Sequence, residues 1–165
     1  MHTDSRNRAG AAKADLSAVR TVQQYAAQAI ARADLSRAAS QAAMEKASRP
    51  DVRELAGYEL MEAKAIIAVL KELGSHAPPM GPDAKAALDM ITNASRGNAF
   101  DRAYIAAQCE NHAYLRDLTA AYLENSDPRT NDAHERQGRQ LATVALCCFT
   151  EHAAVANRIS REIRA

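Results

Sequence analysis

Residues 50–73, PDVRELAGYELMEAKAIIAVLKEL, show the pattern that decides the fold class. Pro50 suits the first position of a helix, because its ring holds φ near the helical value. Apolar side chains then recur at three- and four-residue intervals, as on one face of an amphipathic helix: Val52, Leu55, Ile66, Val69, Leu70 and Leu73. Glu59 and Glu62 interrupt that apolar stripe. We expect one helix over about residues 51–73, with two carboxylates on its inward face.

The rest of the chain has a composition that also favours helices. It has 165 residues, of which 47% are hydrophobic and only 4% aromatic. Alanine, the strongest helix former, is frequent throughout. Proline and glycine divide the chain into five helical stretches, expected at about residues 14–47, 51–73, 83–95, 100–123 and a last one that ends near 163. The sequence therefore predicts an all-α protein.

The lengths of these stretches predict how they pack. Long helices joined by short turns pack antiparallel. The third stretch is much shorter than the others and follows a proline-rich segment, so it is expected to serve as a crossover. We therefore predict an antiparallel four-helix bundle with an additional short crossover helix. Residues 14–165 are expected to form this single domain, and residues 1–13 a disordered N-terminal tail.

Helical projection predicts the inward face of each remaining long stretch. The first presents small side chains: Val19, Val22, Ala26, Ala29, Ala33, Ser36, Ser40 and Ala43. The fourth centres on Phe100, Tyr104, Asn111, Leu115, Leu118 and Tyr122, with His112 toward one side. The fifth presents Leu141, Ala145, Cys148, His152, Val155 and Ile159. Alanine-rich faces of this kind also suggest a homodimer, while no other protein partner is indicated.

Two carboxylates on an inward face need compensation, because burying an unpaired carboxylate costs several kcal/mol. The interpretation we favour from the sequence pairs Glu62 with Arg37, which lies opposite it across the first turn and offers a bidentate fork. A second interpretation leaves both glutamates on a partly exposed, solvated face.

The third interpretation is a metal site in the middle of the bundle. Its candidate ligands are Glu59, Glu62, His112 and His152, with Cys148 as a softer addition. The metal would be iron, zinc or manganese. A zinc site of Cys109, His112, Cys148 and His152 is a further alternative, although Cys109 projects about 130° away from the apolar face of its helix.

Three observations count against the metal site. The Glu-x-x-His signature of di-iron bundles is absent, and the first helix offers serines in place of carboxylates. The two histidines, His112 and His152, lie level only if the turn between the last two helices centres near residue 132. A centre at Pro128 would separate them by roughly 12 Å, given a rise of about 1.5 Å per residue. For His152 alone, the simpler expectation is a core imidazole that donates to a carbonyl or to Tyr104.

Several classes of function are disfavoured. Lys and Arg number 21 and Asp and Glu 20, so no net field would attract nucleic acid or an anionic membrane. No apolar run reaches the roughly 18 residues of a membrane span, and the first ten residues lack the apolar core of a signal peptide. We expect a cytoplasmic protein, or a periplasmic one if an export leader was removed. The three cysteines fit a reducing compartment.

Motifs for enzymatic chemistry are also missing from the sequence. No serine elbow, Cys-His dyad or glycine-rich phosphate loop indicates an enzyme.

Three segments of the chain resemble a known family. They are MEKASRPDVRELA (44–56), GNAFDRAYIAAQCENH (97–112) and TEHAAVANRI (150–159), within a similarity that covers about residues 19–160. They resemble the bacterial ferritin-like domain of unknown function often labelled "predicted outer membrane protein". The resemblance implies a ferritin-like four-helix bundle, usually in exported proteins, without an established activity.

The resemblance also bears on the candidate ligands. It implies histidines at His112 and His152, which this chain retains. The family's Asp-His pair on the second helix aligns with Glu62 and Ala63, and its glutamate on the first helix aligns with Ser36, so the chain differs there. Our prediction is a non-catalytic bundle with a binding or stress-related accessory role. The alternative is a metal-binding or metal-dependent redox protein that uses the four candidate ligands.

Overall fold

The computed structural model describes residues 16–76 and 78–164, and over these residues it is all-helical. The helices are α1 (Val22–Lys46), α2 (Pro50–Glu72), α3 (Pro82–Asn93), α4 (Asn98–Asn125) and α5 (Ala133–Arg164). The predicted all-α class is confirmed. The predicted tail at residues 1–13 lies outside the described residues. Within the described part, no helix combines the length and the apolar character needed to cross a membrane.

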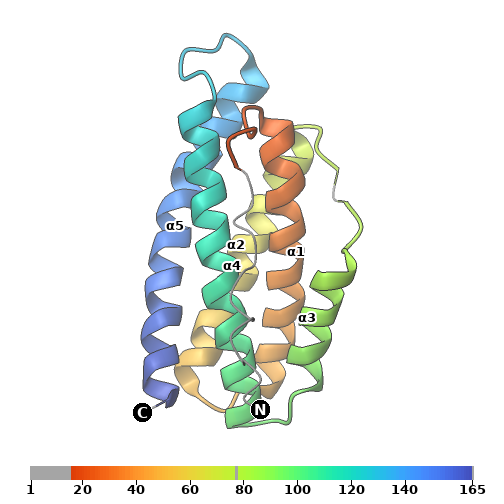
Figure 1. Cartoon of the computed structure of the whole chain (residues 1–165), viewed down its shortest axis with the longest axis vertical. Coiled ribbons are helices and arrows are strands. Elements are labelled where there is room, and N and C mark those ends of the chain that lie inside the picture. Colours follow the sequence, from red (N-terminus) through yellow and green to blue (C-terminus); the bar gives the residue numbers. More distant parts are fainter. Residues whose placement is uncertain (1–15, 77, 165) are drawn as a thin grey trace, which may run out of the picture.

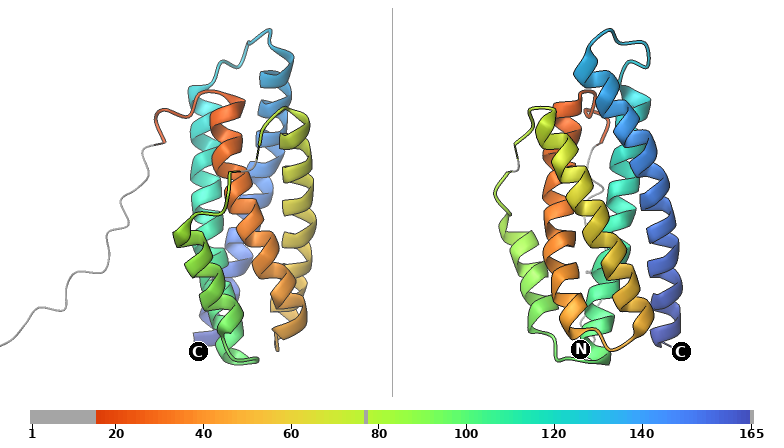
Figure 2. Two further views of the ribbon diagram at one scale, coloured as in Figure 1. Left: turned by 90° about the vertical axis from the view of Figure 1, so that its right-hand side faces the viewer. Right: turned by 180° about the vertical axis from the view of Figure 1, so that it is seen from behind.

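The four long helices lie side by side, and the short α3 packs on the outside (Figure 1). Helix α1 packs mainly against α2, and α4 mainly against α5, while α3 contacts α1 and α4. Each of these pairs of long helices runs antiparallel. The connection that contains α3 returns the chain along the outside of the molecule, so that α4 runs in the same direction as α2 (Figure 2).

Helix α1 begins about eight residues later than the sequence pattern predicted. Thr21 is its N-cap, and the Thr21 side chain accepts a hydrogen bond from the backbone N–H of Gln24. The Gln24 side chain accepts one in return from the backbone N–H of Thr21, which completes a capping box. The Thr-x-x-Gln motif at residues 21–24 is the sequence signal for this start. Helix α2 begins at Pro50, as expected.

The core consists of two apolar clusters stacked along the bundle. The first is built around the stacked rings of Tyr25 and Tyr122, whose centroids lie 4.8 Å apart. The second is built around Phe100 and Tyr104. Between the two clusters, the buried positions of the long helices carry polar or charged side chains: Ser36 on α1, Glu59 on α2, and Gln108, Asn111 and His112 on α4. The bundle therefore has a polar layer at mid-height.

Two carboxylates, one buried and one partly buried, hold the ends of the helices in register. Asp101, fully buried on α4, accepts hydrogen bonds from the backbone N–H groups of Ser48 and Arg49 at the start of α2. At the other end of the bundle, Glu135 on α5 accepts the backbone N–H of Val22 with both oxygens, at 2.9 and 3.0 Å. Because each carboxylate bonds the N-terminus of a different helix, the pair restricts sliding of the helices past one another.

Candidate metal centre

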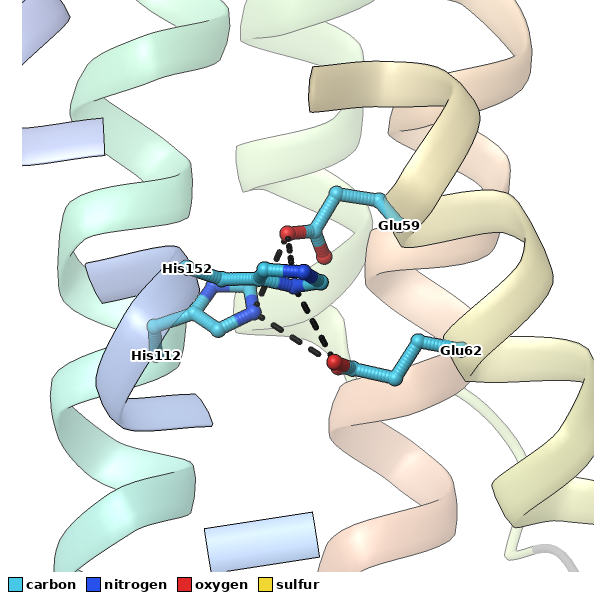
Figure 3. A group of neighbouring side chains, drawn as sticks. All are labelled: Glu59, Glu62, His112 and His152. Atoms are coloured by element: carbon cyan, nitrogen blue, oxygen red, sulfur yellow. Dashed lines mark ion pairs between the residues drawn. The ribbon is translucent and has the colours of Figure 1, made fainter. Parts of the chain in front are cut away.

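The polar layer holds a cluster of two carboxylates and two imidazoles. Glu59 and Glu62 extend from neighbouring turns of α2, His112 from α4 and His152 from α5, and all four converge on one point (Figure 3). Each can offer one ligand atom such that the four atoms lie within 4.8 Å of one another. The structure therefore brings together all four of the ligands considered from the sequence.

The histidine nitrogens closely approach the carboxylate oxygens. His152 Nδ1 lies 3.0 Å from Glu59 Oε1 and 3.0 Å from Glu62 Oε2. His112 Nε2 lies 3.1 Å from Glu59 Oε1 and 3.7 Å from Glu62 Oε1. The centroids of the two imidazole rings are 5.5 Å apart. Glu59 Oε1 thus faces both rings at once.

These approaches do not have the geometry of hydrogen bonds. Over the described residues, Glu59 Oε1, Glu62 Oε2, His112 Nε2 and His152 Nδ1 are all buried and none has a hydrogen-bond partner. Buried polar atoms in proteins are almost always paired, so a group of four that face one another requires an explanation. A cation at their centre would satisfy all four.

The orientation of His112 supports this view. Its Nδ1 lies 3.1 Å from the backbone carbonyl of Gln108. Because a carbonyl oxygen can only accept, Nδ1 carries a proton, and in the neutral ring the Nε2 lone pair then points into the cluster. Histidines that bind metals typically hold their second nitrogen in this way, by donating to a carbonyl or a carboxylate.

A chain of buried side chains holds Glu59 from behind. The Ser36 hydroxyl donates to Glu59 Oε2 at 3.0 Å. Having given its hydrogen to the carboxylate, Ser36 Oγ accepts from Gln108 Nε2 at 3.2 Å, and Gln108 Nε2 also lies 3.4 Å from Ser40 Oγ. Ser40 in turn bonds Tyr104 at 2.8 Å. One oxygen of Glu59 is therefore fixed, while the other is directed at the histidines.

Burial differs across the cluster. The side chains of His112 and Glu59 are 0% and 1% exposed, whereas those of Glu62 and His152 are 11% and 17% exposed. Figure 3 shows the first pair on opposite sides of the cluster, on α4 and α2. Within the described residues, the site is closed toward the bundle interior and reaches solvent past Glu62 and His152.

The electrostatics of the cluster favour two bound protons when no metal is present. Burial alone raises the pKa of Glu59, but the adjacent His112 and His152 outweigh it and lower that pKa to about 2. Burial lowers the pKa of His112, yet Glu59 and Glu62 outweigh it and raise that pKa to about 9. The adjacent carboxylates of Glu59 and Glu62 likewise raise the pKa of His152, to about 10. Two protons or one divalent cation would equally balance the two carboxylates.

The structure differs from three sequence expectations about these residues. Arg37 pairs with Asp34 at 2.9 Å on the half-exposed surface of α1, and Glu62 turns inward to the histidines, so the expected pair between Arg37 and Glu62 does not form. His152 was expected to donate to a carbonyl or to Tyr104. It faces the two carboxylates instead, and the Tyr104 hydroxyl bonds Ser40. The expectation of two solvated glutamates is also wrong, because Glu59 is buried.

The cysteines do not join the cluster. Within the described residues, the group of converging ligand atoms contains neither Cys148 nor Cys109. Cys109 packs at the edge of the second apolar cluster, and burial raises its pKa. The buried face of α5 includes Ala142, Ala145, Phe149 and Ala156. The helix is therefore turned about its axis by roughly the angle between successive residues, relative to the face expected from the sequence. This rotation leaves Leu141, Cys148 and Val155 only partly buried.

The register of the last two helices agrees with the later of the two turn centres considered from the sequence. Arg102 on α4 lies 3.5 Å from the carbonyl of Ile163, and Arg139 on α5 lies 3.1 Å from the carbonyl of Ser126. Both pairs are centred near residue 132, as are His112 and His152. The two histidines are therefore level.

Sequence reasoning missed the residues that support the ligands. Ser36 was counted against a metal site, yet its hydroxyl holds Glu59. Gln108 was not singled out, although it bonds Ser36 and its carbonyl orients His112. Phe149, whose ring lies edge-on to that of His112 with centroids 6.0 Å apart, was not included in the predicted inward face of the fifth helix. A sequence signal was available for both polar residues. Ser36 lies on the predicted inward face of the first helix, and Gln108 lies one turn before His112.

Comparison with known proteins identifies a family but no activity. No curated protein and no solved structure matches the chain. Residues 6–159, nearly the whole chain, match the family described as "Domain of unknown function (DUF4142)". That description agrees with the expected family of unknown function and says nothing of a ferritin-like fold or an outer membrane location. The protein thus belongs to the DUF4142 family of domains of unknown function.

Proposed function

We propose that this protein binds one divalent transition-metal ion through Glu59, Glu62, His112 and His152. The observation that carries the proposal is the convergence, within 4.8 Å, of four ligand atoms that are buried and lack hydrogen bonds within the described chain. Inward-facing carboxylates and histidines on neighbouring helices are the usual way in which helix bundles hold metals.

The spacing of the donor atoms suits a single ion. Around an ion with bonds of about 2.1 Å, neighbouring ligand atoms lie about 3.0 Å apart in an octahedron and about 3.4 Å apart in a tetrahedron. The nitrogen-to-oxygen distances in the cluster are 3.0, 3.0, 3.1 and 3.7 Å. They bracket both values, so an ion would require only small side-chain movements.

The donor set also selects the kind and number of ions. Two carboxylates and two imidazoles suit iron(II), manganese(II) and zinc(II), whereas copper(I) prefers thiolate or thioether ligands, which are absent from the cluster. A second ion would need further carboxylates, as in di-iron bundles. The nearest position on α1 holds Ser36, which bonds Glu59 and leaves one ion as the expected content.

A metal-free cluster of two imidazolium ions and two carboxylates is the principal competing explanation. It would balance the charges, but it would be expected to form directed N–H to oxygen hydrogen bonds, and the four facing atoms have none among the described residues. The bond from His112 Nδ1 to the Gln108 carbonyl fits either state, because an imidazolium would donate it as well. The observation that favours the metal is therefore the lack of hydrogen bonds at the four facing atoms among the described residues.

The proposal extends to the fold and the role of the protein. The arrangement of α1, α2, α4 and α5, with a long connection between α2 and α4, supports a ferritin-like antiparallel four-helix bundle with a crossover helix. Metal binding is favoured over the metal-free accessory role, because that role leaves the Glu and His cluster unexplained.

Metal analysis of protein purified without an affinity tag tests the proposal. The protein is stripped with a chelator, reloaded separately with iron(II), manganese(II) or zinc(II), and desalted before ions are counted. We expect about one ion per chain for at least one metal. His112→Gln should abolish retention, whereas His134→Gln, a matched change at an exposed histidine, should not. Retention near zero for all three metals, or equal retention in the two variants, would refute the site.

A further inference from the structure

A groove between α2 and α5 leads from the surface to the cluster. It has a volume of about 300 Å³. Glu62 and His152 form its polar end, and the other lining residues are Tyr58, Ala65, Ile66, Val69, Leu141, Val144, Ala145 and Cys148. Tyr58 and Val144 are exposed at its rim. Helices α2 and α5 contact each other less than the neighbouring pairs do, and the small side chains Ala65 and Ala145 contribute to the gap.

The groove opens at the accessible side of the cluster. Glu59 and His112 are sealed, and only Glu62 and His152 reach solvent, at the point where they line the groove. Iron(II) and manganese(II) commonly take more than four ligands, so four protein atoms would leave a coordination position. Within the part of the chain that the structure describes, the groove is the route along which an additional ligand could reach that position.

The lining determines the chemistry of such a ligand. Apart from Glu62 and His152, which would be committed to the ion, no lining residue is charged. With a divalent ion, the two carboxylates and two neutral imidazoles would sum to zero charge, so an anionic head group would meet no uncompensated negative charge. An oxygen donor suits the same metals as the carboxylates of the cluster. The volume lies at the small end of the roughly 300–1,000 Å³ of small-molecule pockets.

We propose that the groove between α2 and α5 binds a small monocarboxylate with an apolar chain, whose carboxylate binds the metal ion beside Glu62 and His152 while the chain lies along the apolar walls. This inference rests on the metal site proposed above. The short, narrow groove with its polar end favours a small molecule over a helix or an extended peptide, which would need an apolar surface running the length of the bundle.

The full chain loaded with cobalt(II), a spectroscopic substitute for the native ion, tests the proposal. Octanoate and acetate are titrated separately, and the visible cobalt spectrum reports a change in the ligands of the ion. Both share the same head group, so any difference in affinity measures the apolar chain. We expect octanoate to bind at least about tenfold more tightly, since burying only two methylene groups suffices for that factor.

A matched pair of variants locates the chain of the ligand. Ala65→Trp fills the groove at an exposed position, and Ala68→Trp places the same side chain on α2 outside it. We expect Ala65→Trp to weaken octanoate binding at least about tenfold without changing the cobalt content, and Ala68→Trp to leave both unchanged. If either variant fails to fold, the comparison of octanoate with acetate on the unmodified protein still tests the proposal.

The outcomes separate the two proposals. A full cobalt complement with equal affinity for octanoate and acetate, or with no spectral response, overturns the groove proposal and leaves the metal site intact. A failure to retain cobalt, iron(II), manganese(II) and zinc(II) alike removes both. If size-exclusion chromatography shows a dimer that Ala65→Trp converts to a monomer, the groove is filled by a second copy of the chain, and the proposal of a small-molecule ligand is overturned.

Discussion

The cluster predicts a specific loss of stability when Glu59 is replaced by glutamine in the metal-free protein. Glu59→Gln preserves the side-chain volume, and the amide oxygen can still accept the Ser36 hydroxyl. It removes the negative charge 3.0 and 3.1 Å from the nitrogens of His152 and His112. A fully buried imidazolium at His112 then retains only Glu62, at 3.7 Å.

The magnitude follows from the burial and the pKa shifts. Removing one partner of a buried ion pair typically costs about 3–5 kcal/mol. The rise in the pKa of His112 from 6.5 to about 9, which Glu59 and Glu62 cause together against the opposing effect of burial, corresponds to about 3 kcal/mol, at about 1.4 kcal/mol per unit. Both figures are of the same size, so we expect Glu59→Gln to lower the free energy of unfolding by about 3 kcal/mol near pH 6.

The pH dependence provides an internal check. Histidines with a raised pKa in the folded state contribute stability below about pH 6.5, and that contribution is lost as the pH rises through about 9 and 10. The lowered pKa of Glu59 contributes stability above about pH 4.5, which is lost as the pH falls toward about 2. The cost of Glu59→Gln should therefore be greatest between about pH 4.5 and 6.5 and small above about pH 10.

Urea denaturation of metal-free protein at pH 6 and pH 10.5 measures both effects, because the slope of the transition reports whether folding remains two-state. Glu72→Gln, at an exposed glutamate on the same helix, is the control and should change stability by less than about 0.5 kcal/mol. A loss below about 1 kcal/mol at pH 6, or an equal loss at both pH values, would show that Glu59 is not paired with charged histidines.

Three further predictions concern residues that support the site and the fold. Ser36→Ala should lower metal affinity by about 10–100-fold in a chelator competition, since it removes the hydroxyl that holds the buried carboxylate; unchanged affinity would contradict that role. Asp101→Asn should destabilise the protein by about 1–2 kcal/mol in urea, because it weakens the bonds to the start of α2, and a neutral result would refute the cap. Gly138→Ala should lower the melting temperature, because its Cβ would overlap Val22 Cγ2 and overpacking costs about 1–3 kcal/mol. Gly57→Ala, with open space around it, should instead raise the melting temperature.

The sequence alone was sufficient for the number and order of the helices and for the four ligand candidates. Helical periodicity is a short-range property, so the apolar stripe of α2 and its two interruptions at Glu59 and Glu62 could be read residue by residue. Polar residues at inward positions are rare because they are costly, and this rarity identified His112 and His152 as well. The start of α1 was missed through an overlooked local signal, the Thr21 capping box.

The tertiary structure decided which of these residues meet. Whether Glu62 meets Arg37 or the histidines depends on how α2, α4 and α5 are rotated and how far they are shifted along their axes. A shift of one turn moves a side chain by about 5.4 Å, which is enough to exchange one partner for another. Those quantities are set by many weak contacts between helices distant in sequence, and by ties such as those of Asp101 and Glu135. The same long-range packing rotated α5 so that Phe149 entered the core, and it left the groove open beside the cluster.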